Sequence, residues 1–156
     1  MRNKRGEGYI PTCVMIIILT MLLSVFVTFV SAVNIVKQTK RNSRVVLDSY
    51  VMEESIAIYN SIKNGNDETM TLDSDSYVDS LCDFCTFVKT SNKLYNYNSD
   101  GDMQFYLTKP TVGYMRENEL KIYASYTVYI PIYFAGIRVD TAAIPVTVKS
   151  NFTEKF

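Results

Sequence analysis

Two cysteines, Cys82 and Cys85, are separated by Asp83 and Phe84, and this motif is the one in the sequence that could support redox chemistry. In a dithiol pair of this spacing, one thiolate attacks a disulfide and the other resolves the mixed intermediate. Such a pair usually belongs to a βαβ unit, and the surrounding residues do not predict one. The spacing therefore favours a structural role, either as a local disulfide that closes a short loop or as two free thiols.

The composition excludes several other kinds of site. The chain has no histidine, which excludes Ser-His and Cys-His nucleophile systems and any zinc site with a histidine ligand. Residues 96–102 resemble the start of a calcium loop, but Leu107 occupies the position of the bidentate glutamate. We expect a hairpin turn at these residues. We also expect no cofactor, no bound metal and no enzymatic activity.

A long apolar segment lies near the N-terminus. Residues 8–36 are twenty-nine uncharged residues, and about 20 suffice to cross a membrane as a helix. A secretory signal has an apolar region of only about 7 to 15 residues, so the length favours a retained transmembrane helix over residues 9–36. The alternative is cleavage after Ala32, because Val30-Ser31-Ala32 has the small-residue pattern that signal peptidase recognises.

Charge is distributed unevenly along the chain. Three Lys/Arg precede the apolar segment and four follow it closely, so the positive-inside rule does not decide the orientation. The large C-terminal body favours export, and we expect a single-pass protein of the cell membrane with residues 1–8 in the cytoplasm. From Val45 onward, nine Lys/Arg stand against fifteen Asp/Glu, a net charge of −6. This balance argues against nucleic acid as a partner, whereas the basic residues beside the membrane favour lipid headgroups.

The helical pattern continues past the apolar segment. No Gly or Pro, the residues that most strongly disfavour helix, occurs between Thr12 and Asn64. Apolar residues recur there at helical spacing on two neighbouring stripes: Leu47, Val51, Ile58 and Ile62, and beside them Val45, Met52, Ile56 and Tyr59. We expect one continuous helix, transmembrane over residues 9–36 and amphipathic over residues 37–64, that ends at Gly65. The alternative is two helices with a break near residues 37–43.

Residues 65–156 predict an extracytoplasmic α+β domain with a small antiparallel sheet. A short helix is expected over residues 77–87. Alternating apolar and polar residues and an Asp-Gly turn signal predict the strands: residues 94–98, 103–108, 120–134 and 137–148. A change of parity predicts a bulge near residues 141–143. We expect three to five strands, with the amphipathic part of the helix packed on their apolar face.

The other face of the predicted 120–134 strand is rich in tyrosine. Tyr123, Tyr129 and Tyr133 share this face. Tyrosine combines apolar area with a hydroxyl group and suits subunit contacts, so these residues form a candidate interaction surface. The alternative is that another part of the same chain covers them.

Taken together, the short basic leader, the Gly-Glu junction, the long helix and the small C-terminal sheet resemble the type IV pilin class. Within that class, the chain resembles the TadE-like pseudopilins of tight-adherence systems. The residues NKRGEGYI (3–10) and AAIPVTVKSNFTEKF (142–156) look especially similar to a related, uncharacterised Clostridia-type membrane protein family. The resemblance covers the helix and the C-terminal strands but not the cysteine motif.

The resemblance implies cleavage by a prepilin peptidase after Gly6, and assembly with other pilin-like subunits or with platform proteins. A glutamate commonly lies five residues into the mature chain of that class, whereas here Glu7 would come first and Pro11 fifth. Glu7 would then be placed to pair with the new amine of a neighbouring subunit. The leading hypothesis is a non-enzymatic, membrane-anchored subunit of a pilus or secretion filament. The alternatives are a stand-alone binding domain, secreted or anchored, and a thiol-disulfide protein that uses Cys82 and Cys85.

Overall fold

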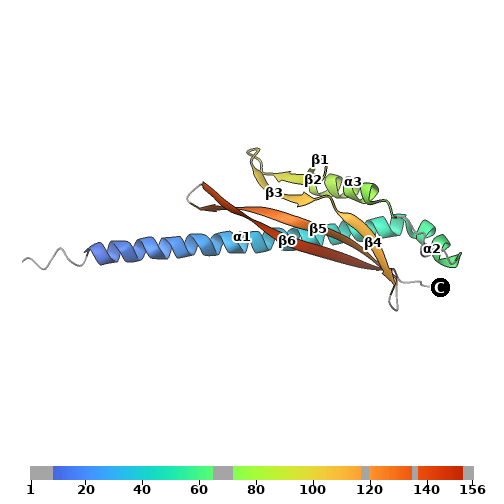
Figure 1. Cartoon of the computed structure of the whole chain (residues 1–156), viewed down its shortest axis with the longest axis horizontal. Coiled ribbons are helices and arrows are strands. Elements are labelled where there is room, and N and C mark those ends of the chain that lie inside the picture. The colour runs from blue at the N-terminus through green and yellow to red at the C-terminus, as the bar shows by residue number, and fades with distance from the viewer. Residues whose placement is uncertain (1–8, 65–71, 117–119, 135–136, 153–156) are drawn as a thin grey trace, which may run out of the picture.

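The protein consists of one long helix that lies along an antiparallel sheet (Figure 1). The computed structural model describes residues 9–64, 72–116, 120–134 and 137–152. The elements in these ranges are, in chain order, α1 (Tyr9–Glu53), α2 (Ser55–Lys63), α3 (Ser74–Cys85), β1 (Val88–Thr90), β2 (Lys93–Tyr97), β3 (Met103–Thr108), β4 (Thr111–Arg116), β5 (Leu120–Phe134) and β6 (Ile137–Phe152). The predicted α+β class, with a long N-terminal helix on an antiparallel sheet, is confirmed.

Helix α1 runs through residues 37–43 without a break, so the alternative of two helices separated there is wrong. The expected continuity as far as Asn64 is also corrected, because the helix is interrupted at Glu54 (φ −81°, ψ 1°). Glu54 still takes part in helical hydrogen bonds on both sides of the interruption. Its N–H donates to the Tyr50 carbonyl, and its carbonyl accepts from the Ile58 N–H, both at 2.9 Å. Any residue type can adopt such a small change in ψ, so the absence of Gly and Pro does not reveal it.

Helix α3 carries the two cysteines and has well-defined ends. The Asp73 carboxylate caps its N-terminus by accepting a hydrogen bond from the Asp75 N–H at 2.9 Å, an arrangement that satisfies a free helix donor. The helix ends where Thr86 adopts a left-handed conformation, with φ 54°. It therefore begins and ends a few residues earlier than the expected 77–87 segment. Its buried residues are Tyr77, Val78 and Leu81.

The sheet is built around β5. Strands β3 and β4 pair with successive parts of the same edge of β5, with Leu107 opposite Val128 and Val112 opposite Ala124. Strand β6 pairs with the other edge along the whole length of β5. Strands β1 and β2 extend the sheet beyond β3. The predicted hairpin between β2 and β3 is present, with Gly101 at φ 85° in its turn.

The described sheet has six strands, where three to five were expected. The additional strands are β1, which has three residues, and β4, which contains Gly113. Gly113 lies opposite Tyr123, and the Tyr123 ring occupies the place of a side chain at residue 113, since a Cβ there would lie 2.7 Å from it. A strand glycine covered in this way weakens the alternating pattern, so β4 has no clear signal in the sequence.

Strand β6 contains the expected bulge at a different residue. Ile132 lies opposite Asp140, and Tyr133 lies opposite Arg138. Val139 is therefore the extra residue, rather than one of residues 141–143. The apolar residues change from odd-numbered to even-numbered positions between Val139 and Ile144, which requires one additional residue in this part of the strand. The pattern alone does not show which residue is the additional one.

The core lies between the sheet, α1 and α3. Even-numbered residues of β5 are buried and face the C-terminal half of α1, as the alternating pattern predicts: Ile122, Ala124, Tyr126, Val128 and Ile130. On α1, the buried apolar residues are Val46, Leu47, Tyr50 and Val51. We call the sheet and α3 the head.

Candidate functional site

Helix α1 passes from an exposed environment to a buried one along its length. Residues 9–27 are all exposed, whereas every buried residue of α1 lies between Thr39 and Val51. The N-terminal part is long and apolar enough to cross a membrane. The helix is therefore compatible with a single-pass membrane anchor whose C-terminal half packs against the head.

A polar contact fixes α1 to the head at Ser43. The Tyr126 hydroxyl of β5 donates to the Ser43 Oγ at 2.7 Å, and the Tyr77 hydroxyl of α3 donates to the Ser43 backbone carbonyl at 3.1 Å. Burial raises the pKa of Tyr126 to about 12 and also raises the pKa of Tyr77. Because a buried phenol needs a hydrogen-bond partner, these contacts favour one position of α1 along the sheet.

One apolar stripe of α1 and α2 faces away from the head. We call Val45, Met52, Ile56 and Tyr59 the lateral stripe; all four are exposed, Met52 by 77% and Ile56 by 74%. The expectation that this stripe packs on the body is therefore wrong. A helix that lies on a sheet buries only one side of its surface, and Leu47, Val51 and Ile58 already occupy that side. The exposed side chains of Val45, Met52 and Ile56 can therefore contact another molecule.

The structure has Cys82 and Cys85 as free thiols, which corresponds to one of the two structural alternatives. Both are partly buried against the core. Burial raises the pKa of each thiol, and this effect exceeds the opposing effects of Lys89 on Cys82 and of Asn42 on Cys85. Because the thiolate is the reactive form, this environment disfavours the chemistry of a redox pair.

The three candidate tyrosines share one face of β5, but they lie at different places along the strand. Tyr129 lies six positions after Tyr123, about 20 Å along a strand. Tyr123 covers Gly113, and Tyr133 lies near the end of β5 beside a cleft. Tyr129 instead belongs to a tyrosine row that runs across the sheet.

The tyrosine row comprises Tyr95, Tyr106 and Tyr129, which lie opposite one another on β2, β3 and β5. The Tyr106 and Tyr129 rings stack with centroids 4.8 Å apart, and the Tyr95 and Tyr106 centroids are 5.6 Å apart. The Lys93 Nζ lies 4.7 Å from the centroid of Tyr106. Sequence reasoning missed Tyr95 and Tyr106 because the row depends on strand register. Their alternation with the buried Leu94 and Leu107 was the available signal.

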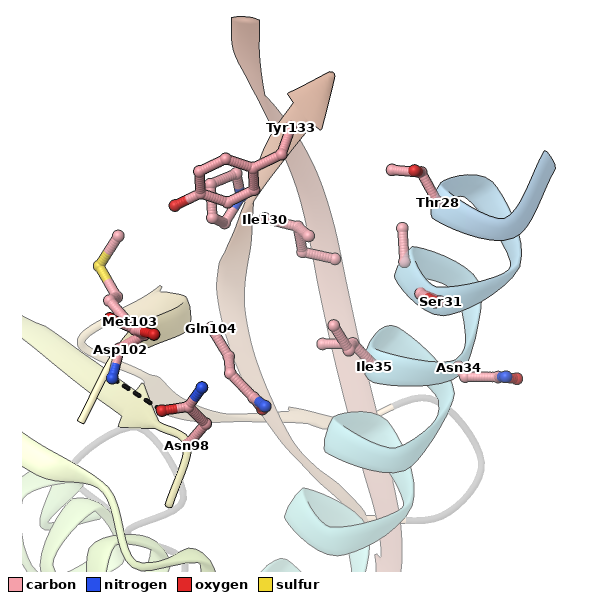
Figure 2. A pocket seen from close by; sticks show the side chains of 12 residues that line it. Thr28, Ser31, Asn34, Ile35, Asn98, Asp102, Met103, Gln104, Ile130 and Tyr133 are labelled. Carbon is pink, nitrogen blue, oxygen red and sulfur yellow. Dashed lines mark hydrogen bonds between the residues drawn. The ribbon is translucent and has the colours of Figure 1, made fainter. Parts of the chain in front are cut away.

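Two clefts separate α1 from the end of the sheet that points toward the N-terminal part of the helix. The larger has a volume of about 760 Å³, and Figure 2 shows Thr28, Ser31 and Ile35 of α1 on one side and residues of β3 and β5 on the other. The second has a volume of about 500 Å³ and an almost wholly apolar lining that includes Phe29 and Ile144. Thr28, Ala32 and Tyr133 line both clefts, so α1 and the sheet diverge here.

The turn that resembles a calcium loop is closed by a side chain. The Asn98 Oδ1 accepts a hydrogen bond from the Asp100 N–H at 3.0 Å. It accepts a second from the Asp102 N–H at 2.7 Å, which Figure 2 shows. These bonds are those of a hairpin turn, as expected. The predicted processing site, Gly6 and Glu7, lies outside the described residues.

We compared the chain with models of known protein families, with curated proteins and with solved structures. None of the three comparisons gave a match. The functional argument therefore depends on the geometry of α1 and of the surfaces around it.

Proposed function

We propose that the protein is a non-enzymatic, pseudopilin-like subunit of a pilus or of a secretion or adherence filament. The observation that carries this proposal is the division of one helix into three surfaces: an exposed apolar N-terminal part, a side buried in the head, and the exposed lateral stripe. A helix that served only to attach a head would be polar on its solvent side. Contiguous exposed apolar residues are typical of a contact with another protein.

In this proposal, residues 9–36 cross the cell membrane, with the N-terminus in the cytoplasm and the head outside. The length of the exposed apolar part supports the crossing. Four basic residues follow it, and all are exposed: Lys37, Lys40, Arg41 and Arg44. Basic side chains at this position favour contact with anionic lipid headgroups, so membrane lipid is the first partner.

The second partner is another pilin-like subunit or an assembly platform protein. Neighbouring helices would pack through the apolar residues of α1 within the membrane and through the lateral stripe beyond it. The stripe follows the helical spacing of seven, four and three residues, which places its side chains on one side of a helical segment. Since α1 is also fixed to the head at Ser43, such packing would set the position of each head in the assembly.

An assembly test follows from the lateral stripe. The double variant Met52→Asp with Ile56→Asp should fold normally, because both side chains are largely exposed. It should nevertheless fail to associate, because charges would be buried at the helix contact. Chemical cross-linking in membranes measures the association. The matched control is Val88→Asp, which places a charge at an exposed apolar residue of β1. Equal cross-linking of all three proteins would contradict the proposal.

Processing by a prepilin peptidase after Gly6 is a separate part of the proposal. Mass spectrometry of the protein purified from its membrane gives the N-terminal residue directly. A chain that begins at Glu7 supports processing. A chain that begins at Met1 dismisses processing, but it leaves the assembly proposal to be decided by the cross-linking result.

A second candidate, a stand-alone binding domain, is favoured by the tyrosine row. Its stacked rings and the Lys93 ammonium group offer a flat aromatic surface with a cation beside it, which suits planar or apolar ligands. Soluble protein that begins at Val33 in the medium would support this candidate. A thiol-disulfide function has less support, because burial raises the pKa of both thiols.

A further inference from the structure

The end of the β5–β6 hairpin exposes large apolar side chains. Ile137 is 71% exposed and Val139 65%, and Tyr133 beside them is also exposed. Figure 1 shows that this hairpin reaches along α1 toward the N-terminal part of the helix. We call Tyr133, Ile137 and Val139 the hairpin tip. Exposed apolar residues gathered at one point of a head are typical of a contact with another molecule or with a membrane.

The cleft of about 500 Å³ sets the level of the hairpin tip along α1. Tyr133 and Val139 line it from the hairpin, and α1 lines it with residues between Ser24 and Val33. The tip therefore lies beside this part of the helix. The polar β2–β3 turn lies by the larger cleft on the other side, where Asn98 and Asp102 contribute to the wall.

The same part of α1 lies where a membrane span should end. About 20 helical residues cross a hydrocarbon core, so the hydrocarbon part of the 9–36 span, counted from Tyr9, ends near Thr28, and the remaining residues lie in the outer headgroup region. Ser24 to Val33 then straddle the outer border of the hydrocarbon. Tyrosine is enriched at this depth, and Tyr133 is available there. Arg138 is also exposed at this end of the hairpin, and a basic side chain there suits lipid phosphates.

We infer that the hairpin tip inserts into the outer interface of the membrane and that phospholipid chains fill the apolar cleft between the tip and α1. The head would then contact the bilayer at two places, through α1 and through β5–β6. This second contact would hold the head at a fixed tilt to the membrane before assembly. The inference depends on the proposed membrane anchoring of α1, and the experiment below separates the two.

The absence of tryptophan from the chain allows a direct test. Single variants of the full chain are reconstituted into phosphatidylcholine liposomes whose acyl chains carry bromine, which quenches tryptophan fluorescence on contact. Ile137→Trp reports on the tip, and Val139→Trp is a second reporter at the same place. Leu22→Trp reports on the membrane part of α1. Met115→Trp is the control outside the membrane, because Met115 on β4 pairs with Lys121 near the start of β5, the end opposite the tip.

The inference predicts a blue-shifted emission for both tip reporters and quenching several-fold stronger than that of Met115→Trp. Quenching of Leu22→Trp without quenching of either tip reporter overturns the inference and leaves the anchor intact. No quenching of Leu22→Trp overturns the anchor and the inference together. Equal quenching of Met115→Trp and the tip reporters also overturns the inference, because the whole head would then lie on the membrane.

Discussion

The Tyr126 hydroxyl lies 2.7 Å from the Ser43 Oγ and joins β5 to α1 across 83 positions of sequence. Ser43 is fully buried. Its backbone carbonyl accepts a hydrogen bond from a second phenol, the hydroxyl group of Tyr77. A sliding movement of the helix along the sheet would leave these hydroxyl groups without partners in an apolar core, which is costly. Ser43 is thus a polar fixed point within a largely apolar interface.

Removing one side of this contact should destabilise the head. Ser43→Ala leaves the Tyr126 hydroxyl without its partner but keeps the carbonyl that accepts from Tyr77. A loss of about 1–3 kcal/mol in the free energy of unfolding is expected. Urea unfolding of the full chain in detergent, followed by circular dichroism, measures it. Tyr97→Phe, which removes an exposed hydroxyl, is the control and should change stability by about 0.5 kcal/mol or less. Equal losses in both variants would contradict the role given to Ser43.

The buried tyrosines should make the head sensitive to alkali. The pKa of Tyr126 is raised to about 12 by burial, from an ordinary value of 10.0. A raised pKa means that the folded state holds the proton more tightly than the unfolded state. The stabilisation is therefore complete below pH 10 and is lost as the pH rises through 12. Unfolding free energies measured across this range should fall with pH. The fall should be shallower for Tyr126→Phe, and an identical slope would refute the assignment.

The two apolar stripes of the amphipathic helix should respond differently to truncation. Leu47→Ala removes a fully buried side chain and should lower the free energy of unfolding by about 2–5 kcal/mol. Met52→Ala removes a largely exposed side chain and should change the free energy of unfolding by about 0.5 kcal/mol or less. The same variant should weaken cross-linking between copies. Denaturant unfolding and cross-linking of the same samples measure both effects. A large loss of stability in Met52→Ala would show that the head itself uses the lateral stripe.

The cysteines of α3 should react slowly with alkylating agents. Burial raises the pKa of both Cys82 and Cys85, so the thiolate fraction at neutral pH is small. Alkylation by iodoacetamide, followed by mass spectrometry, should be slower in the folded protein than in the same chain in urea. The variant with both cysteines changed to serine should still cross-link between copies. Faster alkylation in the folded state would instead favour a redox role.

Features that depend on local pattern were predictable from the sequence. The bounds of β3 and β5 match the predicted strands, because strict alternation over a half-buried strand leaves little freedom. The burial of Leu47 and Val51 likewise follows from helical spacing. The bulge in β6 was predictable in kind but not in place, since the parity change allowed several residues to be the extra one.

Features that depend on strand register, or on how much of the helix surface the head covers, were not predictable from the sequence. The row formed by Tyr95, Tyr106 and Tyr129 requires the pairing of three strands, which no single segment specifies. Helical spacing places Val45 and Met52 beside the core stripe, but it does not say how far around the helix the head extends. The role of Ser43 was hidden for a related reason, because a lone serine between apolar residues gives no signal of the two phenols that reach it from β5 and α3.

Helix α1 packs along both β5 and β6 rather than against the end of the sheet (Figure 1). A force that pulls on the membrane end of the helix would act parallel to this interface. The side-chain contacts would then share the load in shear, whereas a perpendicular pull would peel them apart one after another. The helix could therefore leave the head only if many of its contacts with β5 and β6 broke at once.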